Sequence, residues 1–185
     1  SAVIYPQVAG LKRRVQSRIN TQLQRRVRML LRRQGLAQSG TYLWGANETR
    51  LNNNGVLSLT EDVYAYRQNA AHGLTVRTAA TFDMGTGRIY GLSELFKTGV
   101  DYITPISQEI SRQIMEQNIP LLREFVQIGP NQEYYLTETD LVIYFQTYDY
   151  TPYYVGIPAF PIAVESLRDF IDPRSLLYRL LPPRQ

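Results

Sequence analysis

The chain has 185 residues, of which 44% are hydrophobic and 19% are charged, the balance of an ordinary globular protein and not of a disordered one. This length suits one domain or two tightly joined subdomains, and it buries about 70% of the surface that the unfolded chain exposes. The absence of cysteine excludes disulfides, thiol nucleophiles and cysteine metal sites. The net charge of +4 is uneven, because residues 1–40 carry nine lysines and arginines and no acid.

No apolar run approaches the ~20 residues that a membrane helix needs, and no signal peptide is visible. The chain begins with Ser1 instead of an initiator methionine. We therefore expect that any export signal or membrane anchor has been trimmed away.

The N-terminal part of the chain predicts a short strand and then a long helix. The strand covers residues 3–5 and ends at Pro6. Over residues 11–33, apolar residues recur every three or four positions and arginines fill the other face, which is typical of an amphipathic helix. The apolar stripe consists of Val15, Ile19, Leu23, Val27, Leu30 and Leu31. Gly35 supplies a C-cap.

A meander of antiparallel strands is predicted next. Two strands, over 41–51 and 56–67, flank the tetrapeptide Asn52–Gly55. Its Asn-Gly pair is a strong hairpin signal, because both residues tolerate positive φ. A further strand over 74–83 is followed by a Gly-containing turn and a short return over 88–90.

The second half of the chain predicts a shorter helix and further strands. After one helical turn at 93–96, a helix runs from Thr104 to about Asn118, with Thr104 as its N-cap and Pro105 as its first helical residue. Its apolar stripe is Ile106, Ile110, Ile114 and Met115. The predicted strands are 133–137, 141–147 and 157–164, and helical turns at 166–171 and 173–181 end the chain.

The residues that could carry chemistry are few. His72 is the only histidine, and no nucleophile, zinc or phosphate-loop motif accompanies it. One histidine cannot form the usual multi-histidine metal site, so no metal is predicted and a structural or binding role is favoured. The acids near strand ends are Asp83, Asp101, Glu133, Glu138 and Asp140. We interpret them as solvated turns and caps, and a hydrolase that pairs His72 with Asp83 is the remote enzymatic alternative.

The arginine-rich helix could bind nucleic acid or an anionic membrane. Its cations lie opposite an ordinary apolar stripe, with no recognition motif and no aromatic residue among them. A solvated helix face is the favoured interpretation, and no nucleic-acid partner is expected.

Tyrosines crowd one segment of the chain. Seven of the 14 tyrosines fall between Tyr134 and Tyr154, and four of these lie in 148–154 beside Pro152. Those on strands are expected in the core. We predict that Tyr148–Gly156 forms an exposed, ordered loop between two neighbouring strands, with Tyr154 and at least one other tyrosine facing solvent. Tyrosine offers contact area with a polar tip, so the loop either recognises a partner or only caps the core.

Several segments, in order along nearly the whole chain, carry a family resemblance. They are Tyr5–Val8, Ala71–Gly73, Thr81–Asp83, Leu92–Phe96, Tyr135–Thr137, Leu141–Phe145 and Tyr148–Pro158. Together they resemble the extracytoplasmic domain of the RsiV-like lysozyme-sensing anti-sigma factors, a domain also found beside peptidoglycan deacetylase domains. One departure is that Asn69-Ala70 stands where the family has paired glycines.

The resemblance implies an α+β fold of two subdomains, 1–90 and 91–185, in which the two helices pack on mainly antiparallel sheets. It implies a non-catalytic binding or sensor domain outside the cytoplasm, either secreted or held by a lipid or membrane anchor, with no cofactor.

The implied partner is lysozyme or another cell-wall-active protein, and the alternative is a cell-wall glycan bound by an accessory module. Partner contacts are carried over to Pro152 and Tyr154 first, and then to Tyr153, Tyr150 and Tyr148 of the same loop. The turn at His72 and Gly73 is a second structural or binding element.

Overall fold

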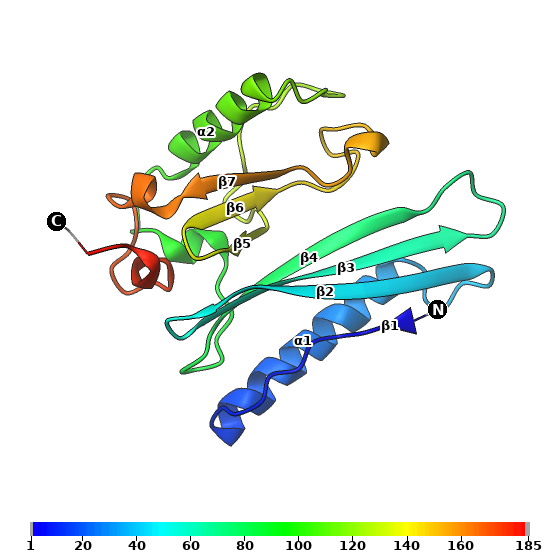
Figure 1. Cartoon of the computed structure of the whole chain (residues 1–185), viewed down its shortest axis with the longest axis horizontal. Helices are drawn as coiled ribbons and strands as arrows, with labels where there is room; N and C mark the ends of the chain where they lie inside the picture. The colour runs from blue at the N-terminus through cyan, green and yellow to red at the C-terminus, as the bar shows by residue number, and fades with distance from the viewer. Residues whose placement is uncertain (1, 184–185) are drawn as a thin grey trace.

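The computed structural model describes residues 2–183 as an α+β fold of four layers (Figure 1). Sheet 1 has the order β1 (Ala2–Val3), β2 (Thr41–Asn53), β3 (Val56–Arg67) and β4 (Leu74–Asp83). Sheet 2 has the order β5 (Tyr134–Leu136), β6 (Asp140–Tyr144) and β7 (Ala159–Ala163). Helix α1 (Arg13–Arg33) covers the outer face of sheet 1, and α2 (Ile103–Glu116) covers the outer face of sheet 2. The predicted fold class is confirmed.

Four short 3₁₀ helices complete the fold: η1 (Leu92–Leu95), η2 (Tyr153–Val155), η3 (Val164–Leu167) and η4 (Leu177–Leu180). None of the helices found between residues 2 and 183 is long and apolar enough to cross a membrane.

Helix α1 forms where its apolar stripe can be buried against sheet 1. Ile19, Leu23, Val27 and Leu30 of the predicted stripe are buried, while arginines on the opposite side are exposed. The helix ends at Arg33, and Gly35 follows with a φ of +92°, a left-handed conformation that glycine adopts without strain. The Gly35 N–H donates to the Arg32 carbonyl at 3.1 Å.

The strands of sheet 1 follow the predicted meander. Asn54 and Gly55 have φ values of +50° and +72°, as the tight β2–β3 hairpin requires. Strands β2, β3 and β4 pair antiparallel, and only the two-residue β1 pairs parallel, with β2.

The start of α2 differs from the prediction. The helix begins at Ile103, and Thr104 donates its backbone N–H to the Asp101 carboxylate at 3.0 Å. Thr104 as N-cap was therefore wrong, because the acid two residues before the helix satisfies this free N–H instead. Met115 was also wrong as a core residue, since it is 71% exposed.

The two halves of the chain share a core. The largest cluster of buried side chains lies between α2 and sheet 2, and it includes Leu51 and Val56 from the end of the β2–β3 hairpin. The predicted division at residue 90 falls between the two sheets and stays a prediction.

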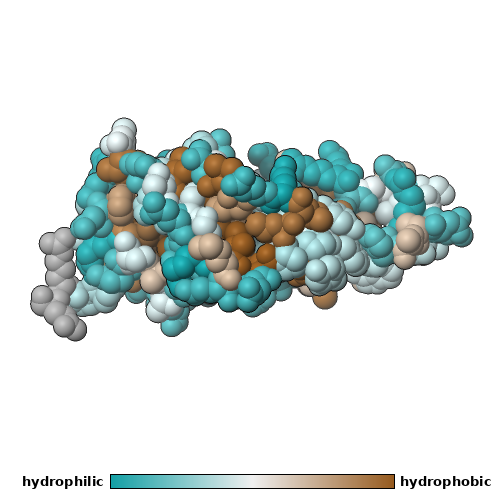
Figure 2. Space-filling model, turned by 90° about the horizontal axis from the view of Figure 1, so that it is seen from above, coloured by the Kyte–Doolittle hydropathy of each residue, from teal (hydrophilic) through white to brown (hydrophobic). Residues whose placement is uncertain are grey.

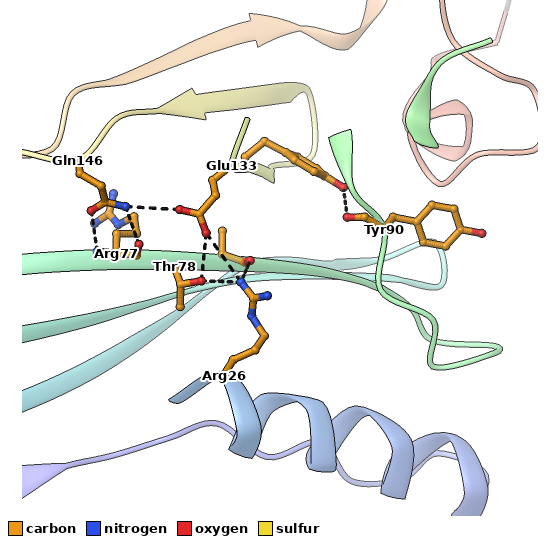
Figure 3. A network of polar contacts seen from close by, with 8 residues as sticks. Arg26, Arg77, Thr78, Tyr90, Glu133 and Gln146 are labelled. Atoms are coloured by element: carbon orange, nitrogen blue, oxygen red, sulfur yellow. Dashed lines mark hydrogen bonds and ion pairs between the residues drawn. The ribbon is translucent and has the colours of Figure 1, made fainter. Parts of the chain in front are cut away.

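Polar contacts join sheet 2 to the edge of β4 (Figure 3). The Gln146 side chain accepts from the Arg77 N–H at 3.0 Å and donates to the Arg77 carbonyl at 2.7 Å. Thr78 donates to the Glu133 carboxylate at 3.2 Å, and Arg26 of α1 approaches that carboxylate at 3.9 Å. One amide side chain thus pairs with β4 in the way a neighbouring strand would.

Glu61 is an acid buried between sheet 1 and α1. Its residue is 3% exposed, and neither carboxylate oxygen has a hydrogen-bond partner among the described residues. Burial raises the pKa of Glu61 to about 7, and the charge of Arg26 opposes part of that rise.

We predict that ionisation of Glu61 destabilises the folded protein. Because its folded pKa lies above the ordinary value of 4.5, the folded state holds the proton more tightly. The stability from this group is complete below pH 4.5 and is lost as the pH rises to about 7. The loss in the free energy of unfolding is on the order of 3 kcal/mol.

Urea denaturation at several pH values measures this effect. Glu61→Gln should lose this part of the pH dependence and should be more stable than the wild type at pH 8. Glu138→Gln, on an exposed turn, is the control and should keep the wild-type dependence. A wild-type pH slope in Glu61→Gln would contradict the prediction.

Candidate functional site

The tyrosine loop, Tyr148–Gly156, connects β6 to its neighbour β7 and is internally hydrogen-bonded. The Phe145 N–H donates to the Pro158 carbonyl at 3.1 Å and closes the base of the loop. The Tyr148 N–H donates to the Thr151 carbonyl, also at 3.1 Å. These bonds fix the loop between two strands, as predicted.

Three tyrosines of this loop face solvent. Tyr154 is 79% exposed, Tyr148 48% and Tyr153 39%, so the predicted exposure is confirmed. Tyr150 is half-buried and packs edge-on against Phe145, with ring centroids 4.8 Å apart. Tyr150 therefore anchors the loop to Phe145 of the core.

Pro152 lies at the start of η2 with φ −66°, the value that its ring imposes. Pro152 is half-buried, and in the sequence it separates the buried Thr151 from the exposed Tyr153 and Tyr154. Contacts of Pro152 and the loop tyrosines with a partner stay predictions.

The backbone of the loop is strained at Tyr148. Its φ is +74°, in the left-handed region that bulky residues rarely adopt. Such a conformation costs of order 1–3 kcal/mol and is concentrated at functional sites. The strain therefore indicates that the exposed tyrosines are a candidate functional site.

His72, in the turn between β3 and β4 of sheet 1, contacts this loop. Its ring stacks on Tyr153, with centroids 4.1 Å apart, and the Tyr153 ring lies 6.1 Å from that of Tyr148. Three rings from two distant segments thus form one row. The predicted His72 turn and the predicted tyrosine loop are parts of the same surface.

The turn before β4 depends on Gly73. A Cβ on this buried residue would lie 2.3 Å from Cζ of Tyr64 and 2.5 Å from the Ala65 carbonyl oxygen, so only glycine fits. Asn69 has φ +67° in the same turn. Asparagine tolerates this conformation, so it substitutes for a glycine in the backbone.

The structure does not bring together the residues of the enzymatic alternative. His72 precedes β4 and Asp83 ends it, which separates them by a ten-residue strand of roughly 33 Å. Asp83 accepts from the Gly85 N–H at 2.7 Å and from Arg179 at 2.8 Å, as a turn cap does. Within residues 2–183, no group of three or more histidine, cysteine or acidic side chains could hold a metal ion.

An aliphatic patch beside the tyrosine loop was missed by the sequence analysis. It consists of Leu121, Leu122 and Val126, which are 37%, 57% and 73% exposed. The Leu122 N–H donates to the Tyr150 carbonyl at 2.7 Å, so the patch and the loop form one surface. Figure 2, seen from the α2 side, shows hydrophobic residues along the middle of the face with hydrophilic ones around them. The sequence signal was the group of apolar residues at 121, 122, 125 and 126 after Pro120, whose spacing does not tell that three of them are exposed.

The fold has counterparts among known proteins. Residues 93–165 match the model of a family described as "Protein of unknown function (DUF3298)", and this range contains α2, sheet 2 and the tyrosine loop. A DUF3298 family protein from Pseudomonas aeruginosa is 16% identical with a TM-score of 0.68, over 94% of this chain and 85% of that chain. A member of the family from Bacteroides fragilis is 16% identical with a TM-score of 0.62, over 90% and 69%. No curated protein matches the chain.

These two likenesses show the fold alone, because the identity is low. The match of residues 93–165 to this family model supports the broader part of the sequence-based resemblance. The narrower likeness to lysozyme-sensing or deacetylase-associated members stays a prediction.

Gly73→Ala tests whether the turn and Tyr64 are held together. The added methyl group should lower the free energy of unfolding by about 1–3 kcal/mol, the usual cost of overpacking. Gly129→Ala is the matched control, because its methyl group meets no atom within 4 Å. Urea denaturation of both variants measures the difference, and an unchanged stability in Gly73→Ala would show that the turn relaxes freely.

Proposed function

We propose that the chain is a non-catalytic binding module that recognises another protein through the tyrosine loop and the aliphatic patch. The observation that carries this proposal is the strained, hydrogen-bonded loop that holds Tyr154 in solvent. A loop ordered before binding loses less entropy when a partner docks. Exposed aliphatic residues beside it supply the apolar area that protein interfaces bury.

The proposed partner is lysozyme or another cell-wall-active protein, and the proposed location is outside the cytoplasm. The ordered sequence resemblance supports both. Animal lysozymes are usually basic, so a basic surface at the site would repel them. The arginine-rich α1 lies on the far side of sheet 1 from the tyrosine loop (Figure 1). The main positive charge is therefore directed away from the docking surface.

The alternative ligand, a cell-wall glycan, has less support at this loop. Sugars stack on aromatic rings, but Leu121, Leu122 and Val126 offer no ring beside the tyrosines.

Tyr154→Ala separates recognition from folding. The change should alter the free energy of unfolding by no more than about 0.5 kcal/mol, because the side chain is exposed. If Tyr154 is a hot spot, lysozyme binding should weaken by about 2 kcal/mol or more, measured by calorimetry at moderate salt. Tyr178→Ala, which removes a 45% exposed tyrosine from η4, is the control and should bind as the wild type does.

Two results would count against the proposal. No heat and no co-elution with lysozyme at tens of micromolar, roughly −6 kcal/mol, would remove lysozyme as the ligand. Several kcal/mol of destabilisation in Tyr154→Ala would show that this tyrosine supports the fold instead of a partner.

A further inference from the structure

A second aromatic surface lies on sheet 1, on the face opposite α1. We call it the aromatic face, and it consists of Tyr42 and Trp44 on β2 and Tyr64 and Tyr66 on β3. The β2–β3 register pairs Tyr42 with Tyr66 and Trp44 with Tyr64, which places all four side chains on one side of the sheet.

Sheet 2 covers the same side of sheet 1, but only at the other end of its strands. There, Arg50 lies over the ring of Tyr135 at 4.8 Å and Arg77 lies over that of Tyr144 at 5.8 Å. Beyond this contact, Trp44 is 47% exposed and Tyr42 is 45% exposed. Large apolar surface of this kind in a soluble protein usually marks a binding site.

The four rings form a regular block. Ring centroids are 6.3 Å apart between Tyr42 and Trp44, 6.5 Å between Tyr42 and Tyr66, and 5.8 Å between Trp44 and Tyr64. The planes of these pairs differ by 22° to 44°. The distance between neighbouring rings of the block is therefore close to the length of one sugar unit.

The chemistry of the aromatic face suits an uncharged ligand with apolar faces and a polar rim. It offers ring faces, tyrosine hydroxyls and one indole N–H, and none of its side chains is charged at neutral pH. The adjacent ion pair is neutral overall, because Arg77 donates to Asp62 at 2.7 Å through two nitrogens. A polyanion would instead be drawn to the arginines of α1, on the opposite face of sheet 1.

The aromatic face also continues towards the tyrosine loop. Tyr64 touches Gly73, and the ring of the preceding residue, His72, packs against Tyr153. A ligand that extends from the aromatic face would therefore meet further rings.

We propose that the aromatic face binds an uncharged, extended glycan chain by stacking sugar units on its rings. Chains of equatorially linked pyranoses fit best, because they are flat and present C–H groups on both faces while their hydroxyls point outward to the rim. This site lies on sheet 1 and adjoins the protein-binding surface of the proposed function where His72 meets Tyr153.

Trp44 makes the test direct, because it is the only tryptophan of the chain. Chitohexaose and cellohexaose are titrated against the protein while its tryptophan fluorescence is recorded. At least one of them should change the emission with saturation, and calorimetry should give the same affinity.

Variants locate the binding. Tyr42→Ala keeps the Trp44 reporter and should weaken binding at least tenfold, and Trp44→Ala, followed by calorimetry, should do the same. Tyr178→Ala is the matched control, because Tyr42 and Tyr178 are both 45% exposed, and it should bind as the wild type does. Circular dichroism melts confirm that each variant is folded.

Three results would overturn the proposal. The first is that neither hexasaccharide changes the fluorescence or produces heat at millimolar concentration. The second is that both Tyr42→Ala and Trp44→Ala bind with wild-type affinity. The third is that the protein binds only heparin and that high salt abolishes this binding. The last result would assign saccharide binding to the arginines of α1. Tyr154→Ala should leave hexasaccharide binding intact, so the two surfaces can fail independently.

Discussion

The free edge of β4 is the constraint on which the arrangement of the two sheets depends. β4 is the last strand of sheet 1, and only its end is paired, through the bridge between Phe82 and Ile89. The rest of this edge leaves backbone groups that must be satisfied or protected. No strand of sheet 2 pairs with it. Instead, Gln146 bonds both backbone groups of Arg77, Arg26 donates to the Ala79 carbonyl, and the Tyr90 N–H donates to the Thr81 carbonyl at 2.9 Å.

These contacts at the edge of β4 explain which part of sheet 1 stays uncovered. Gln146 and Glu133, which flank the strands of sheet 2, contact β4 at Arg77 and Thr78, so sheet 2 is anchored over one end of sheet 1. The other end keeps its inner face uncovered, and Trp44 and Tyr42 lie there. A full strand pairing along β4 would have brought the sheets together over a longer stretch. Exposure of the aromatic face is thus a consequence of how the two sheets meet.

The sequence predicted what depends on local pattern. The period of the apolar residues located α1, and Asn54-Gly55 located the hairpin, because both signals act within a few residues. The exposed tyrosine loop followed from Pro152 and Pro158, which cannot donate backbone hydrogen bonds and so disfavour a continuous strand.

The sequence could not predict what depends on contacts between distant segments. His72 and Tyr153 are far apart in the chain, and only the docking of sheet 2 stacks their rings. Exposure of Met115 depends on what α2 packs against, which its own period does not show. Tyr42 and Trp44 are two residues apart in β2 and so share a face, but strand alternation does not tell which face a second sheet will cover.

Charge separates the surfaces of this molecule further. Within residues 2–183, Arg26 is the one cation of α1 that has a carboxylate partner, and that partner lies across the edge of β4. The remaining arginines of α1 are exposed. Arg33, in the last turn of the helix, lines a hollow that also contains His72. The field of a charge falls off within about 10 Å at ordinary ionic strength, so the arginines in the first turns of α1 act on ligands at the α1 side. A basic protein at the tyrosine loop and an uncharged glycan at the aromatic face therefore both bind away from most of this positive charge, which a polyanion would meet first.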